Sequence, residues 1–203
     1  MRRLYGQRMM QTPLTIRRWS RVEYEKLVDS GFFHGDPVEL IGGQLIVAEP
    51  QGTYHVTCVC LVGDRLRAAL PPGWIVRTQM PISLDDDSAP EPDVVVARGA
   101  YEDYLNAHPT VPALVVEVAD TSLGFDRNLK GSVYARGGVR DYWVVNVTDR
   151  VLEVYRDPHP DPGAAWGWSY RSMRTVRAAD TVTPLALPST VISVGSLLPR
   201  SRA

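Results

Sequence analysis

The sequence has little cysteine, no long apolar run and almost no net charge. Its two cysteines, Cys58 and Cys60, have no cluster of His or Cys near them, which argues against a zinc site and against a disulfide-stapled secreted scaffold. We expect both to be small buried hydrophobic residues in a helix. No apolar run approaches the ~20 residues that span a membrane. The basic N-terminus also lacks a signal-peptide hydrophobic block, so a reducing cytoplasm is the expected compartment.

The formal net charge is −1 over 203 residues, so the chain as a whole has no electrostatic footprint for nucleic acid. Binding of that kind requires a local basic patch. The sequence also contains no glycine-rich phosphate loop ending in Lys-Ser/Thr, no G-x-G-x-x-G, no H-E-x-x-H and no G-x-S-x-G. These absences argue against P-loop nucleotide hydrolysis, dinucleotide redox chemistry and serine hydrolase chemistry.

A composition of 44% hydrophobic and 22% charged residues is that of an ordinary globular domain, large enough to bury a core. We predict one domain over residues 19–198, preceded by a disordered basic tail over residues 1–18. The fold class is α/β (α+β), a mixed β-sheet flanked by helices with an N-terminal helix and a β-hairpin. Helices are predicted at 20–31, 53–70 and 125–136; strands at 37–41, 44–50, 74–84, 93–97, 113–119, 139–147 and 151–156; and a Pro/Gly-rich loop at 157–169, before one or two terminal strands.

Two of the apolar strands each carry a carboxylate, which is expensive in a strand covered on both faces unless something compensates it. Asp93 begins "DVVVA", and Glu117 lies within "VVEVA". If these strands are neighbours in one sheet, the two side chains converge near one edge. Two carboxylates in a half-buried site repel each other unless a cation lies between them. Mg²⁺ suits such a site because it accepts one or two carboxylates and completes its shell with water and phosphate oxygens.

Lys130 is the third candidate, and two interpretations of it stay open. Asp126 and Lys130 are four residues apart on a predicted helix, which is typical of a surface ion pair contributing a few tenths of a kcal/mol. Alternatively, Lys130 turns back toward Glu117, where its ammonium group could orient an attacking water or stabilise charge on a scissile phosphate.

Several spaced blocks together resemble one protein family. "EPDVVVA", "LVVEVADTS", "DRNLK", "YARGGVRDYWVV" and "VLEVYR" are similar to the Uma2 family, also called DUF820, over nearly the whole chain. The resemblance implies a restriction endonuclease-like fold of the PD-(D/E)xK type. It implies that Asp93 and Glu117 hold the metal and that the lysine of the motif is Lys130. The usual motif would place lysine two residues after Glu117, where this chain has Ala119.

The same resemblance extends to supporting residues. It implies that Glu39 joins the metal shell directly or through water, that His55 opens the helix beside the site, and that Gln79 faces the site as a neutral hydrogen-bonding group. For His55, capping of the helix end or packing at the surface is the alternative. Asp126 is expected to help aim Lys130.

The leading hypothesis is a metal-dependent endonuclease that uses Mg²⁺ or Mn²⁺ to hydrolyse phosphodiester bonds in nucleic acid, with DNA favoured over RNA. The alternative is a binding or regulatory module that keeps the fold and has lost useful catalysis. A third hypothesis is phosphoester hydrolysis on a small substrate. Nucleases of this fold often act on two strands as dimers, so a homodimer is expected by analogy; no membrane partner is expected.

Overall fold

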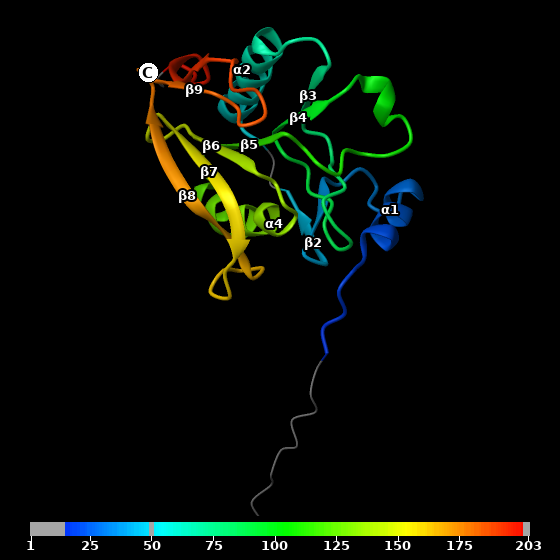
Figure 1. Ribbon diagram of the computed structural model, residues 1–203. Helices are drawn as coiled ribbons and strands as arrows, with labels where there is room; N and C mark the ends of the chain where they lie inside the picture. Colours follow the sequence, from blue (N-terminus) through cyan, green and yellow to red (C-terminus); the bar gives the residue numbers. More distant parts are fainter. Residues whose placement is uncertain (1–14, 49–50, 201–203) are drawn as a thin grey trace, which may run out of the picture.

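The computed structural model describes residues 15–48 and 51–200. A six-stranded mixed sheet in the order β3-β4-β5-β6-β7-β8 lies at its centre, with α2 against one face and α4 against the other (Figure 1). Only β5 and β6 run parallel in this sheet, and the chain between them forms the helical crossover that a parallel pair requires. The predicted mixed sheet flanked by helices is confirmed.

Helices and strands are spread along the described residues. The helical elements are α1 (Arg21–Asp29), α2 (Thr53–Ala69), η1 (Tyr101–Tyr104), α3 (Leu123–Phe125), the π-helical turn η2 (Asp126–Lys130), α4 (Gly131–Arg136) and η3 (Val194–Ser196). The strands are β1 (Val38–Ile41), β2 (Gln44–Val47), β3 (Trp74–Thr78), β4 (Val94–Arg98), β5 (Leu114–Ala119), β6 (Asp141–Asn146), β7 (Val151–Pro160), β8 (Trp168–Arg177), β9 (Thr181–Val182) and β10 (Ile192–Ser193).

The N-terminal helix and hairpin follow their local sequence signals. Ser20 and Glu23 form the predicted capping box at the start of α1, which satisfies two amide groups that a helix start leaves without partners. Gly42 and Gly43 both have positive φ, 56° and 75°, and such a two-residue turn joins β1 to β2 with the twist of the strands. Most of the predicted tail, residues 1–14, lies outside the described residues, whereas Arg18 lies over the ring of Trp166.

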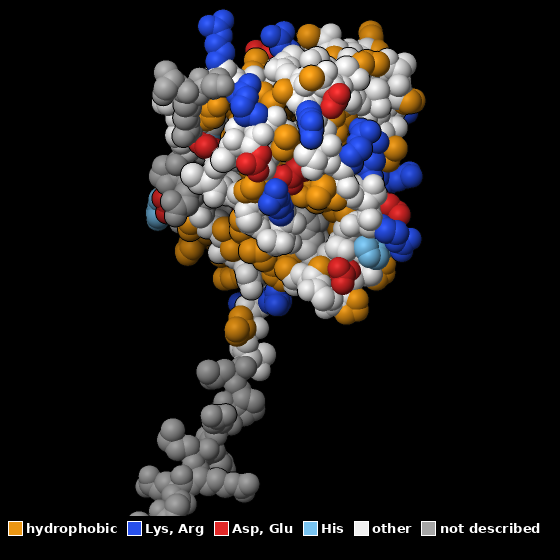
Figure 2. Space-filling view, turned by 90° about the vertical axis from the view of Figure 1, so that its left-hand side faces the viewer, with side chains coloured by type: hydrophobic (Ala, Val, Ile, Leu, Met, Phe, Trp, Pro, Cys, Tyr) orange, Lys and Arg blue, Asp and Glu red, His pale blue; other side chains and the backbone are white. Residues whose placement is uncertain are grey.

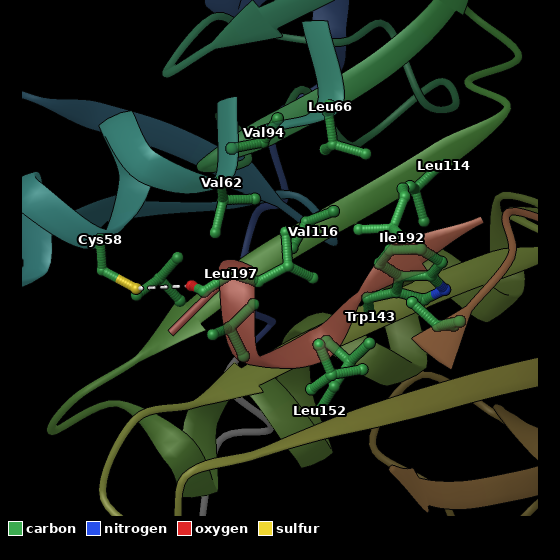
Figure 3. Close-up of a cluster of buried hydrophobic side chains, with 14 of the residues drawn as sticks. Cys58, Val62, Leu66, Val94, Leu114, Val116, Trp143, Leu152, Ile192 and Leu197 are labelled. Carbon is green, nitrogen blue, oxygen red and sulfur yellow. Dashed lines mark hydrogen bonds between the residues drawn. The ribbon is translucent and has the colours of Figure 1, made fainter. Parts of the chain in front are cut away.

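The two faces of the sheet bury different side chains, as strands covered on both faces require. Val62 and Leu66 of α2 pack with Val94 and Val116 on one face (Figure 3), and a second cluster with α4 packs on the other. Glu117 shares its face with Val115, which belongs to the α4 cluster, because side chains two residues apart on a strand point the same way. The sheet therefore presents Glu117 to the α4 side.

Two of the sequence predictions, one about a strand and one about the cysteines, are wrong. The predicted strand at 74–84 ends at Thr78, because Gln79 adopts a left-handed backbone with φ 50° that cannot continue a strand. In addition, the cysteines do not share one environment. Cys58 is buried, with its thiol against the carbonyl oxygen of Leu197 (Figure 3), whereas Cys60 is exposed. Side chains two residues apart on a helix lie on different faces, so only one of the pair reaches the core.

The predicted loop at 157–169 is shorter than expected, because only residues 161–167 lie outside the strands. β7 continues to Pro160 and β8 begins at Trp168, so only a short turn separates them. Pro158 pairs with Tyr170 in this arm. Proline has no amide hydrogen to donate to a neighbouring strand. It is tolerated at position 158 because the pairing of β7 with β6 reaches only to Arg156, so beyond Arg156 that edge of β7 has no strand neighbour to bind.

Candidate active site

Asp93 and Glu117 face each other across two antiparallel strands. Val94 of β4 pairs with Val116 of β5, so continuing the register by one residue places Asp93 opposite Glu117. The Asp93 amide donates to Glu117 Oε2 at 3.3 Å, and the Val118 amide donates to Asp93 Oδ2 at 2.8 Å. The convergence expected from two neighbouring strands is therefore present, and both side chains are buried.

Lys130 reaches the same carboxylate from η2. Its Nζ donates to Glu117 Oε1 at 3.0 Å and lies 3.6 Å from Glu39 Oε1. The hydroxyl group of Tyr134, one turn later on α4, donates to Glu117 Oε1 at 2.6 Å. Both donors bind the same oxygen, so Oε2 is the oxygen of Glu117 that faces Asp93.

His55 and Glu39 complete the surroundings of the pair. His55, in the first turn of α2, places Nε2 3.1 Å from Asp93 Oδ1, so of its two interpretations the structure supports the one beside the site. Burial opposes the charged imidazolium, but the hydrogen bond and negative charge of Asp93, with the charges of Asp126 and Asp120, raise the pKa of His55. Glu39 comes from β1, where its Oε2 accepts a hydrogen bond from the Glu91 amide at 3.0 Å.

Gln79 and Asp126 lie beside the site without bonding to Glu117: the Gln79 backbone amide donates to the Asp93 carbonyl oxygen at 3.0 Å, and the charge of Asp126 acts on Lys130. The Gln79 side chain donates to Gln51 at 2.6 Å and forms no hydrogen bond with Asp93 or Glu117. Asp126 and Lys130 do not form a surface ion pair: both are buried, and Asp126 accepts a hydrogen bond from Ser122 at 2.5 Å. A spacing of four residues predicts the shared face correctly, but Lys130 binds the carboxylates of β5 and β1 instead.

Electrostatics distinguish Glu117 from an ordinary ion-paired carboxylate. Burial raises its pKa, and the charges of Asp93 and Asp126 raise it further, while Lys130 and the Tyr134 hydrogen bond lower it without compensating fully. Burial works against the positive charge of Lys130, but the surrounding carboxylates, Glu117 first, raise its pKa. The site therefore favours the charged form of Lys130 and disfavours the charged form of Glu117.

Comparisons with known proteins show the family and the fold of the chain. The profile of the Uma2 family, described as "Putative restriction endonuclease", matches residues 21–195.

The chain belongs to the Uma2 family.

A solved structure of "a putative nuclease belonging to DUF820 from Anabaena variabilis" superimposes with a TM-score of 0.60 at 16% sequence identity, covering 88% of this chain and 96% of that one. At that identity the likeness concerns the fold, which is the restriction endonuclease-like fold expected for Uma2. No curated protein matches the chain. Within the described residues, no helix has both the length and the apolar character needed to cross a membrane.

The donors of this Uma2 site suit a hard divalent ion with few protein ligands. Within residues 15–48 and 51–200, no group of three or more His, Cys, Asp or Glu side chains is arranged to hold a metal ion. Asp93 and Glu117 thus form a set of two carboxylates, one of which carries an incompletely compensated charge. Mg²⁺ is commonly held by one or two carboxylates with water in its remaining positions, so the residues fit such an ion.

Sequence reasoning missed Tyr134 and Glu91 at the site. Tyr134 lies four residues after Lys130, and a pair at that spacing on a helix can bind one acceptor. Glu91 precedes the Pro92–Asp93 motif by one residue; burial and the charge of Glu39 raise its pKa. Glu153 was also missed, although it lies in the apolar strand "VLEVYR" and gives the same signal that singled out Glu117.

Proposed function

We propose that this Uma2 protein is a metal-dependent endonuclease that hydrolyses phosphodiester bonds in nucleic acid, preferring DNA to RNA. One observation carries the proposal: Asp93 and Glu117 lie opposite each other in the sheet while Lys130 donates to Glu117 at 3.0 Å. The description of the Uma2 family and the likeness of the fold to that of the solved DUF820 structure support it.

Asp93 and Glu117 would hold Mg²⁺ or Mn²⁺, and Glu39 would join them through water, because no third carboxylate of the described residues is arranged to bind the ion directly. When bound, such an ion supplies Lewis-acid polarisation of the phosphate and lowers the pKa of a coordinated water. Glu117 Oε2 accepts a hydrogen bond from the Asp93 amide at 3.3 Å, while Lys130 and Tyr134 bind Oε1. His55 holds the Asp93 side chain in orientation through Oδ1.

Lys130 has the properties of a charge-stabilising group. Its raised pKa keeps it protonated near neutral pH, so it has no lone pair with which to remove a proton from water. An ammonium group fixed beside the carboxylates can orient the attacking water and stabilise negative charge that develops on the phosphate. This narrows the two roles considered for Lys130, positioning or activation of water, to positioning and charge stabilisation.

The test is cleavage of supercoiled plasmid DNA and of a labelled RNA by the purified chain with Mg²⁺ or Mn²⁺. Asp93→Asn and Glu117→Gln keep the side-chain shape and remove the charge, and each should lower the cleavage rate by about 100-fold or more. Asp64→Asn, on an exposed carboxylate of α2, is the control and should cleave as the wild type does. Equal cleavage by the wild type and both site variants would refute the assignment.

The second candidate is a binding or regulatory module with the same fold. The observation in its favour is that Asp93 and Glu117 already have protein partners in His55, Lys130 and Tyr134, as a purely structural network would. In addition, Lys and Arg side chains on the side seen in Figure 2 are scattered among acidic and apolar ones rather than gathered into one basic surface. Calorimetric titration with Mn²⁺ discriminates between the two candidates. A folded chain that does not bind Mn²⁺ at millimolar concentration would favour the binding or regulatory module over the endonuclease.

A homodimer and a cytoplasmic location remain predictions. Two copies would present two sites to the two strands of a duplex, and sedimentation at micromolar concentration measures the oligomeric state. A screen of small model phosphodiesters checks the third hypothesis, since hydrolysis of these compounds without cleavage of nucleic acid would favour a small substrate.

A further inference from the structure

The turn η2 contacts two strands through two basic side chains. Lys130, at its end, donates to Glu117 of β5 at 3.0 Å. Arg127, near its start, donates to Glu153 of β7 through Nε at 2.9 Å and Nη2 at 2.5 Å. Glu117 and Glu153 lie in one row of the sheet, both paired with Val144 of β6, so their strands are about 10 Å apart. Arg127 therefore contacts the sheet away from the proposed site.

The Arg127–Glu153 pair is a fully satisfied anchor. Glu153 is 2% exposed, and besides the two bonds from Arg127 it accepts one from the Tyr155 hydroxyl at 2.7 Å and one from Asn146 Nδ2 at 3.1 Å. Burial alone would raise its pKa, but these hydrogen bonds, those from Arg127 first, lower the pKa of Glu153. A bidentate arginine–carboxylate pair has fixed geometry as well as strength, so it locks the start of η2 onto β7.

A turn of this kind needs external support. In η2 the Gly131 amide bonds to the Asp126 carbonyl oxygen five residues back, and the wider π-helical turn is rare outside functional sites. The Tyr142 hydroxyl also donates to the Asp126 carbonyl oxygen at 3.0 Å. One extra residue in the turn splays Arg127 and Lys130 apart, which lets each reach its own strand.

We propose that the Arg127–Glu153 pair positions Lys130 by holding the start of η2 on β7, so that the ammonium group at the end of the turn lies against Glu117. The consequence of this positioning for catalysis rests on the proposed function. Without the pair, η2 can relax toward ordinary α-helical geometry, which rotates Lys130 away from Glu117. Arg127 is a positioning residue because its guanidinium group binds a carboxylate two strands away from Glu117.

The chain offers an unusually clean measurement, because Lys26 and Lys130 are its only lysines. Lys26 is exposed and Lys130 is 7% exposed, so acetylation at each, quantified by mass spectrometry of the peptides, reports Lys130 against an internal reference. In the wild type, Lys130 should be acetylated far more slowly than Lys26. Arg127→Met should raise the Lys130 rate by about tenfold, as expected for a local opening that becomes easier by ~1.4 kcal/mol, and leave Lys26 unchanged.

Arg156→Met is the matched control. Arg156 also forms a two-pronged pair with a buried carboxylate, reaching Asp141 through Nε at 2.7 Å and Nη2 at 3.3 Å, and it lies on the same strand β7. Its loss should lower the free energy of unfolding and leave the acetylation of Lys130 as slow as in the wild type. If Arg127→Met fails to fold, Tyr155→Phe weakens the same anchor and should change the Lys130 rate in the same direction.

Kinetics provide the second arm of the test. With nucleic acid as substrate, Arg127→Met should lower kcat by about tenfold or more with KM nearly unchanged, the pattern of an interaction used in the transition state, whereas Arg156→Met should preserve kcat. If the wild type cleaves nothing, the proposed function fails while acetylation still decides the positioning. Wild-type protection of Lys130 in Arg127→Met, or equal exposure of Lys130 in Arg156→Met, would overturn the inference.

Discussion

Glu117 and Glu153 occupy matching places in the molecule but are in opposite electrostatic states. Each is 2% exposed, each lies on the α4 face of the sheet, and each binds a cation from η2. The pKa of Glu117 is raised, first by burial and then by Asp93 and Asp126. The pKa of Glu153 is lowered, because hydrogen bonds from Arg127, Tyr155 and Asn146 outweigh its burial.

The difference lies in the neighbours rather than in burial. Glu153 accepts two hydrogen bonds on each oxygen. Glu117 accepts two on Oε1, from Lys130 and Tyr134, but only the longer bond of 3.3 Å from the Asp93 amide on Oε2. A buried carboxylate with all its partners stabilises the fold, while one with too few leaves negative charge that a further cation would neutralise. Glu153 is thus suited to anchoring, and Glu117 to binding a metal ion.

The largest expected effect comes from neutralising the two carboxylates in turn. Glu153→Gln should lower the free energy of unfolding by about 3 kcal/mol, because it removes the charge from a buried carboxylate that accepts several hydrogen bonds, two of them from the partly exposed Arg127. Glu117→Gln should change it by only about 1 kcal/mol, since the lost bond to Lys130 is offset by relief of burial and of repulsion from Asp93. Denaturant unfolding at pH 7 with EDTA measures both. Equal losses, or a larger loss for Glu117→Gln, would contradict the comparison.

A smaller effect should appear in the pH dependence of stability, through Asp126. Burial raises the pKa of Asp126 to about 6 from its ordinary 3.8, against the opposing effects of Lys130 and Ser122. The unfolded chain loses this proton near pH ~4 and the folded chain near ~6, so its contribution to stability is complete below that window and is lost as the pH rises through it.

Asp126→Asn removes that contribution. It also removes one of the charges that make the pKa of Glu117 higher than that of Glu153. The fall in unfolding free energy between pH 4 and 6 should become smaller by about 2 kcal/mol. Denaturant unfolding at several pH values measures it, with the exposed Asp64→Asn as control. Curves for Asp126→Asn that run parallel to the wild type would show that Asp126 does not titrate in this window.

The smallest effect concerns the two tyrosines that donate to these carboxylates. Tyr155→Phe removes one hydrogen bond from Glu153, and Tyr134→Phe removes one from Glu117. Each should lower the free energy of unfolding by about 1 kcal/mol, measured by denaturant unfolding. Only Tyr134→Phe should also alter Mn²⁺ affinity, measured by calorimetry, because its hydroxyl group binds the proposed ligand. A change of affinity in Tyr155→Phe alone would reverse the assignment of the two sites.

Local signals predicted much of this fold and of its candidate site. The capping box of α1, the Gly-Gly hairpin and the buried strands around Asp93 and Glu117 are visible in short stretches of sequence, because capping, turn geometry and alternation act between near neighbours. Glu153 was within reach of the same reasoning and was overlooked. The loop predicted at 157–169 was too long, because proline and glycine content indicates turns without revealing that a strand edge has no partner to bind.

What the sequence by itself determined is which groups are expensive to bury: two acids in apolar strands, and a lysine on the helix that follows. Tertiary structure decided how they are compensated. The register of β4 and β5 places Asp93 opposite Glu117. From the π-helical turn, Lys130 binds Glu117 and Arg127 binds Glu153. The fold likewise determined that the Gln79 side chain donates its hydrogen bond to Gln51. The physical reason is that the apolar neighbours that make a charge costly to bury are adjacent to it in the sequence. The partner that offsets this cost lies far away in the sequence, and the packing of the fold determines which group it is.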